Sequence, residues 1–233
     1  MARKHVTVAL SGDGGDESLG GYRRYRMHQG EEALRNCLPH GLRRPLFGAL
    51  GQMYPKADWA PRPLRAKTTL QALAMDSVQA YHHSMSHLLA DQRQVLFSAA
   101  FQRCLGGYSS LNVFRQYALQ TEIDDPLALI QYLDYKTWLV GDIYTKVDRA
   151  SMAHLLEVRE PLVDHQLVEW LATLPSDLKI RGGEGKYVLK KAFEPLLPRE
   201  VLYRPKMGFS VPLASWLRGP LAQRLKESVL SPR

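Results

Sequence analysis

The 233-residue chain lacks any apolar run near the roughly 18 residues that a membrane-spanning helix requires. Its first apolar run, residues 6–10, is short and leads directly into a glycine-rich segment. We therefore expect neither a membrane span nor a signal peptide. Cysteine is also scarce: Cys37 and Cys104 are isolated, and their spacing fits neither a zinc site nor a disulfide framework. This usage predicts a protein of the reducing cytoplasm.

The composition is that of an ordinary globular domain, with 45% hydrophobic and 23% charged residues. The formal net charge of +8 raises the question of nucleic-acid binding, for which affinity would fall steeply with salt. However, the basic residues are dispersed, and no zinc finger or aromatic-interleaved basic motif is present. A small phosphate-bearing ligand accounts for the charge equally well, so we expect no nucleic-acid partner.

Strand patterns are nearly absent. Residues 6–10 form a β-branched apolar run typical of a buried strand that ends in a loop, and no second convincing strand follows. Most of the remaining sequence has helical periodicity, with helix starts at Asp124-Asp125-Pro126 and at Asp164. The proline-rich segment 39–67 is interpreted as a loop-rich connection. Any larger sheet would need strands upstream of Met1, which makes the chain look truncated.

The loop after the predicted strand is the first candidate site. Three glycines among residues 11–17 permit close backbone approach to a phosphate, and Asp16 is a suitable ligand for Mg²⁺. The segment lacks the Gly-Lys-Ser/Thr ending of a Walker loop. Taken alone, it is also compatible with a glycine-rich turn that carries solvated acids.

Two further segments carry cations beside glycines. In residues 179–186, glycines precede a predicted helix and Lys186 adds a movable positive charge, a combination that favours anions. In residues 203–212, Lys206 lies in a segment bounded by prolines, which is typical of a mobile cationic lid. A helical stripe of Asp142, Lys146 and Arg149 is also charged. Taken alone, residues 179–186 are also compatible with a surface turn that carries an exposed lysine, and residues 203–212 with an ordinary surface loop.

Segments that carry these residues resemble, in order along the chain, the synthetase domain of the asparagine synthetase B (glutamine-hydrolysing) family. They lie at residues 11–22, 145–153, 156–165, 185–190 and 204–209. The resemblance implies an α/β parent fold of the adenine nucleotide alpha hydrolase-like type. It also implies that residues 1–233 are the C-terminal portion of the asparagine synthase domain, mostly α-helical with one short N-terminal strand.

The resemblance implies asparagine synthesis from aspartate, ATP and ammonia or glutamine through a β-aspartyl-AMP intermediate. The implied cofactors are ATP and Mg²⁺. The implied roles are nucleotide binding for Ser11 and Gly12, catalysis for Asp13, Lys186 and Lys206, substrate contact for Asp142, Asp148 and Arg149, and Mg²⁺ ligation for Asp16.

The chain departs from the family pattern at several points. Glu160 stands where the family usually has Val, and Val163 where Leu is usual. The family's first nucleotide loop, Ser-Gly-Gly-x-Asp-Ser, and its N-terminal glutaminase domain are missing. We therefore expect ammonia from a glutaminase domain supplied elsewhere and a homodimer or complementing chain as partner. A non-catalytic remnant that docks on a full-length paralogue, or an amidotransferase for another carboxylate, remain alternatives.

Overall fold

The computed structural model describes residues 1–55, 61, 66–205 and 211–230. The chain divides into two compact units, residues 1–192 and 193–233. It is mostly helical with few short strands. Within the described residues, no helix combines the length and apolar character needed to cross a bilayer.

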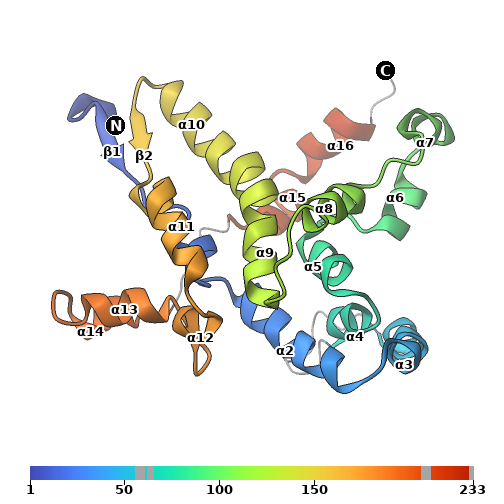
Figure 1. Ribbon diagram of the computed structural model, residues 1–233. Coiled ribbons are helices and arrows are strands. Elements are labelled where there is room, and N and C mark those ends of the chain that lie inside the picture. The colour runs from blue at the N-terminus through green and yellow to red at the C-terminus, as the bar shows by residue number, and fades with distance from the viewer. Residues whose placement is uncertain (56–60, 62–65, 206–210, 231–233) are drawn as a thin grey trace. The chain divides into compact units, whose positions relative to one another are not determined.

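The first unit contains a two-stranded parallel sheet. Strand β1 (Val8–Leu10) lies beside β2 (Glu157–Arg159) (Figure 1). The two strands pair in a register that sets Val8 opposite Glu157. The amide of Ser11 extends this ladder by donating to the Arg159 carbonyl at 2.8 Å. The expectation of a single strand was therefore wrong. Only one of the three residues of β2 is apolar, so the sequence shows no strand pattern there. The strand forms because it pairs with β1.

A second small sheet is antiparallel. Strands β3 (Ile180–Arg181) and β4 (Glu184–Gly185) form a hairpin whose turn is Gly182-Gly183. Both turn glycines have positive φ, +57° and +78°. Such values are typical of the tight turns that join two antiparallel strands.

Helices make up most of the first unit. They are α1 (Gly15–Ser18), α2 (Arg23–Cys37), α3 (His40–Met53), α4 (Lys67–Leu73), α5 (Ser77–Met85), α6 (Ala90–Leu96), α7 (Ala99–Leu105), α8 (Ser110–Ala118), α9 (Pro126–Asp134), α10 (Thr145–Met152), α11 (His165–Thr173), α12 (Ser176–Lys179) and α13 (Tyr187–Phe193). A π-helical segment, Tyr135–Tyr144, joins α9 to α10, and single 3-10 turns form at Ala2–Lys4 and Pro161–Val163. The second unit contains α14 (Arg199–Leu202), α15 (Leu213–Arg218) and α16 (Ala222–Leu230).

Two predicted helix starts are confirmed. The Asp125 side chain accepts a hydrogen bond from the Ala128 amide at 2.7 Å, and Pro126 occupies the first position of α9. Asp164 caps α11 by accepting from the Gln166 amide at 3.0 Å. Both carboxylates satisfy amides that have no partner inside the helix.

Residues 40–53 do not form the loop that the prolines of segment 39–67 suggested, and residues 56–60 and 62–65 of that segment lie outside the described residues. Residues 40–53 form helix α3, which contains Pro45, although proline inside a helix costs about 3 kcal/mol or more. Tertiary contacts offset this cost: the buried Arg43 donates to the Leu73 carbonyl and, at 2.6 Å, to the Met75 carbonyl. The helix is thus stabilised by α4 and the connection that follows it rather than by its own sequence.

The apolar core of the first unit lies between α2, α5 and α9. It consists of Tyr25, Tyr81, Leu127, Ile130 and Leu133. Asp134, fully buried at the end of α9, accepts hydrogen bonds from the Arg24 guanidinium at 2.6 Å and the Tyr25 hydroxyl at 2.5 Å. This core therefore holds α9 in place against α2 and α5.

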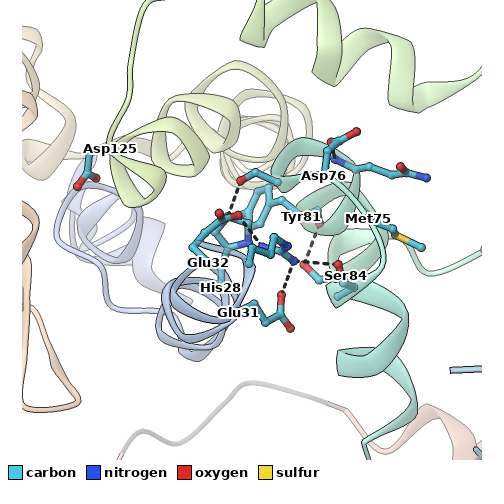
Figure 2. Close-up of polar contacts among 12 residues, drawn as sticks. His28, Glu31, Glu32, Met75, Asp76, Tyr81, Ser84 and Asp125 are labelled. Atoms are coloured by element: carbon cyan, nitrogen blue, oxygen red, sulfur yellow. Dashed lines mark hydrogen bonds and ion pairs between the residues drawn. The ribbon is translucent and has the colours of Figure 1, made fainter. Parts of the chain in front are cut away.

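A buried polar network lies beside this core, where α2 meets α4 and α5 (Figure 2). Arg35 pairs with Glu32 at 2.5 Å and Glu31 at 3.1 Å, and it donates to the Ala72 carbonyl at 3.0 Å. His28 bonds Ser77 Oγ at 3.0 Å, and burial lowers the pKa of this histidine to about 4. The charges of Arg35, Glu31 and Glu32 are paired with one another, although Arg35 Nε has no hydrogen-bond partner among the described residues, so we interpret the network as structural.

Candidate active site

The loop that follows β1 is shaped by its glycines. Gly14 adopts φ +79°, and a Cβ atom at this position would overlap Val163 Cγ1. A Cβ at Gly15 would lie 2.6 Å from Leu162 Cδ1. The Ser11 hydroxyl donates to Asp13 Oδ2 at 2.5 Å, which ties the start of the loop to its centre. The loop therefore packs closely against the turn that follows β2, and only glycine fits at the contact.

Helix α1 turns two adjacent carboxyl groups in different directions. Glu17 is buried, and its carboxylate accepts a hydrogen bond from the Tyr22 hydroxyl at 2.8 Å. Burial raises the pKa of Glu17, because the charged form is poorly solvated there. Asp16 keeps 24% of its side chain accessible. Successive helical residues point about 100° apart, so Glu17 anchors α1 while the Asp16 side chain points to another side of the helix and stays partly accessible.

The β3–β4 hairpin brings a cation to Asp16. Lys186 Nζ lies 3.1 Å from Asp16 Oδ1, and the Lys186 amide donates to the Leu19 carbonyl at 2.9 Å. Glycine allows this approach, since a Cβ at Gly21 would overlap Asp16 Oδ1 and one at Gly185 would overlap the Gly20 carbonyl oxygen. The motifs of residues 11–22 and 185–190 are thus in direct contact.

The predicted glycine-rich helix entrance has a different form from the one expected. Its glycines form the hairpin turn, and the Lys186 amide is already bonded within the protein. Lys186 itself has φ +58°, which is uncommon for a residue with a side chain. The cation of this segment, rather than its backbone amides, is presented to the site.

The charged stripe of residues 142–149 lies on the surface. Asp142, in the π-helical segment, is 4.0 Å from Lys146 Nζ, and Asp148 and Arg149 are exposed on α10. Tyr144 of the same stretch lies near the loop, because its hydroxyl would be 3.8 Å from a Cβ at Gly14. The structure therefore places this stretch beside the Gly14 loop but does not bring Asp142 or Arg149 into contact with Asp16.

An acidic residue that sequence reasoning did not assign to the site belongs to this neighbourhood. Burial raises the pKa of Glu160, and the nearby charges of Asp13 and Asp148 raise it further. Burial and the charge of Glu160 also raise the pKa of Tyr144. The signal in the sequence was the charge at a position where the related family has Val. Lys206 lies outside the described residues.

Comparison with known proteins assigns the whole chain to a family. Residues 1–233 match the family model described as asparagine synthase. The chain belongs to the asparagine synthase family. No solved structure matches it significantly.

The relatives of this asparagine synthase chain are longer proteins. A Mycobacterium tuberculosis H37Rv protein named "Putative asparagine synthetase [glutamine-hydrolyzing]" is 36% identical over 218 residues, which cover 93% of this chain and 31% of the relative. Asparagine synthetase [glutamine-hydrolyzing] 1 of Bacillus subtilis is 31% identical over 232 residues, which cover 98% of this chain and 34% of that protein. The chain thus spans about a third of the length of these relatives.

The asparagine synthase family uses ATP, and the donors present can be compared with the needs of the accompanying metal. Among the described residues, no group of three or more His, Cys, Asp or Glu side chains is arranged to hold a metal ion. Mg²⁺ does not require such a group, since it is usually bound by one or two carboxylates, phosphate oxygens and water. The partly accessible Asp16 carboxylate fits this mode of binding. The described residues offer no closed protein cage for the metal.

Proposed function

We propose that this chain contributes part of an ATP-dependent asparagine-forming site centred on Asp16 and Lys186. The observation that carries the proposal is their contact of 3.1 Å, made by two loops that are distant in the sequence. A carboxylate able to hold Mg²⁺ and an ammonium able to meet phosphate are thus adjacent at the carboxyl end of β1. Ligands bind at this end of the strands in open α/β folds.

The proposed reaction has two steps. An oxygen of the aspartate β-carboxylate attacks the α-phosphorus of ATP, and pyrophosphate leaves with the electrons of the broken phosphorus–oxygen bond. Ammonia then attacks the acyl carbon of β-aspartyl-AMP, loses a proton and releases AMP. Mg²⁺ supplies charge neutralisation on the phosphates. Lys186 and Lys206 are proposed to stabilise the negative charge that develops on the departing pyrophosphate.

The remaining predicted residues are assigned as proposals to binding. Ser11 and Gly12 line the nucleotide, and Asp13, bonded to Ser11, faces the reacting carboxyl group. Arg149 offers a planar guanidinium for an aspartate carboxylate. Asp142 and Asp148 provide negative charge for the aspartate ammonium group. The exposure of these three side chains supports a role toward a ligand rather than in packing.

The sheet of the first unit suggests how the site is completed. Val6, two residues before β1, and Val8 and Leu10 within it alternate along the chain and remain 47%, 36% and 75% exposed. Parallel sheets are normally covered on both faces, and a sheet of two strands is marginally stable alone. We propose that another part of an asparagine synthase domain, in the same or a complementing chain, adds parallel strands here.

The proposal is tested by complementation. The chain is mixed with the part of the Bacillus relative that precedes its matching region, and pyrophosphate release is measured with ATP and aspartate. We expect release that requires both substrates and is suppressed by Asp16→Asn. Pyrophosphate release that does not depend on aspartate would contradict the proposed substrate.

A docking function without catalysis is the second candidate, because the same exposed sheet would bind a paralogue whether or not chemistry follows. Co-purification of the two chains, with no pyrophosphate release above the level of the Asp16→Asn variant, would favour this function. It would also overturn the catalytic proposal.

A further inference from the structure

Lys179, the last residue of α12, is a buried cation. Only 2% of its surface is exposed, and its Nζ donates to Gln131 Oε1 at 3.0 Å. Over the ranges that the structure describes, no carboxylate forms an ion pair with it. Burial lowers the pKa of Lys179, and the charge of Asp125 only partly counteracts this. A buried ammonium is costly, so its retention requires an explanation beyond packing.

The hydrogen bond of Lys179 continues to the candidate site. Gln131 lies on α9 with 3% exposure, and its side-chain amide donates to the backbone carbonyl of Glu17. Glu17 is in α1, directly after Asp16. A path of two buried hydrogen bonds therefore connects the base of the β3–β4 hairpin to the helix that carries Asp16.

The two ends of the hairpin segment are thus attached to α1 by two lysines. Lys179 precedes β3 and reaches α1 through Gln131, whereas Lys186 follows β4 and reaches Asp16 directly. A Cβ at Gly20 would lie 2.6 Å from Ile180 Cγ1, so the two segments also meet between these ends. The position of Lys186 depends on how the whole hairpin is seated.

We propose that Lys179 is a positioning residue, which acts through Gln131 to seat the hairpin so that Lys186 meets Asp16. The inference rests on the proposed function for its catalytic meaning, but its structural content is independent of ATP. A neutral side chain of equal length would fill the same volume without a hydrogen-bond donor. The hairpin would then lose its polar attachment at one end, and Lys186 would separate from Asp16 more often.

The test is acetylation of lysines under native conditions, with the extent at each lysine measured by mass spectrometry. In the unaltered chain, we expect slow acetylation of Lys186 and essentially none of Lys179. Lys179→Met and Gln131→Leu should each raise the rate at Lys186 by about tenfold, the scale of losing one hydrogen bond to a charged group. The double variant should match each single variant, because both changes break one path.

Two further variants keep the test decisive. Arg181→Met is the matched control, since Arg181 is a cation of the same hairpin whose 3.0 Å pair with Asp177 is exposed, and it should leave the Lys186 rate unchanged. Gln131→Glu keeps an acceptor for Lys179 but removes the donor to the Glu17 carbonyl. It should raise the Lys186 rate even if Gln131→Leu fails to fold.

A Lys186 rate within twofold of the unaltered chain in Lys179→Met or Gln131→Glu would overturn the inference, because a residue that only supports stability would leave this rate unmoved. The proposed function is read separately, from protection of Lys186 by Mg·ATP in the complemented protein. A lack of protection would count against the proposed function alone.

Discussion

Replacement of Gly14 by alanine tests whether the loop after β1 is held by its contact with the turn after β2. Gly14 has φ +79°, and an added Cβ would overlap Val163 Cγ1. The substitution therefore combines two separable costs, one from the backbone conformation and one from packing.

The magnitudes follow from these two terms. A left-handed conformation costs an L-residue with a side chain roughly 1–2 kcal/mol, and forcing an extra carbon into a packed contact costs roughly 1–3 kcal/mol. We expect Gly14→Ala to lower the free energy of unfolding by about 2–5 kcal/mol. Gly183 has nearly the same φ, +78°, with no atom within 4 Å of its Cβ position. Gly183→Ala should therefore show only the backbone term, about 1–2 kcal/mol.

Urea unfolding followed by tryptophan fluorescence measures both variants. Removing the obstructing methyl group with Val163→Ala should restore part of the stability lost in Gly14→Ala, which a double-mutant cycle detects. Equal destabilisation by Gly14→Ala and Gly183→Ala, with no coupling to Val163→Ala, would show that the loop does not pack as described.

Three other outcomes are expected. In the complemented protein, Asp16→Asn should raise the Mg²⁺ concentration needed for half-maximal pyrophosphate release, with an unchanged urea midpoint. Asp134→Ala should lower the unfolding free energy by about 3–5 kcal/mol, because it leaves the Arg24 guanidinium partly buried without its partner. The pKa of His28 is about 4 in the folded protein against 6.5 ordinarily, so the unfolded chain binds more protons between these values. Stability should fall as pH drops from 6.5 to 4, less so in His28→Gln, and an identical slope would refute this.

Local sequence chemistry predicted the features that depend on neighbouring residues. Asp125 and Asp164 cap helices because each carboxylate reaches amides only two or three positions ahead. The loop after the first strand was predicted because the apolar run of residues 6–10 gives way to the glycine-rich residues 11–17. In these cases the physical cause is contained within a few residues of the sequence.

Features that depend on distant residues were missed. β2 has only one apolar residue and forms because its backbone pairs with β1. Helix α3 tolerates Pro45 because Arg43 donates hydrogen bonds to the carbonyls of Leu73 and Met75. The hairpin at residues 180–185 was obscured by its brevity, since two residues per strand give no periodicity. Tertiary contacts decided the first two outcomes, whereas the hairpin is local but too short to give a pattern.

The pairing of Asp16 with Lys186 belongs to the second class, and it constrains the proposed chemistry. One carboxylate oxygen cannot hold Mg²⁺ and a lysine ammonium at the same place, because two cations at such a distance repel each other. If the metal takes Asp16 Oδ1, the oxygen that Lys186 contacts, Lys186 must turn toward another anion, and the phosphates that accompany the metal provide one. The Asp16–Lys186 ion pair would then be replaced by two others, Asp16 with Mg²⁺ and Lys186 with phosphate, so that every charge keeps a partner. A residue held near Asp16 by the hairpin, with a flexible side chain, is suited to that exchange.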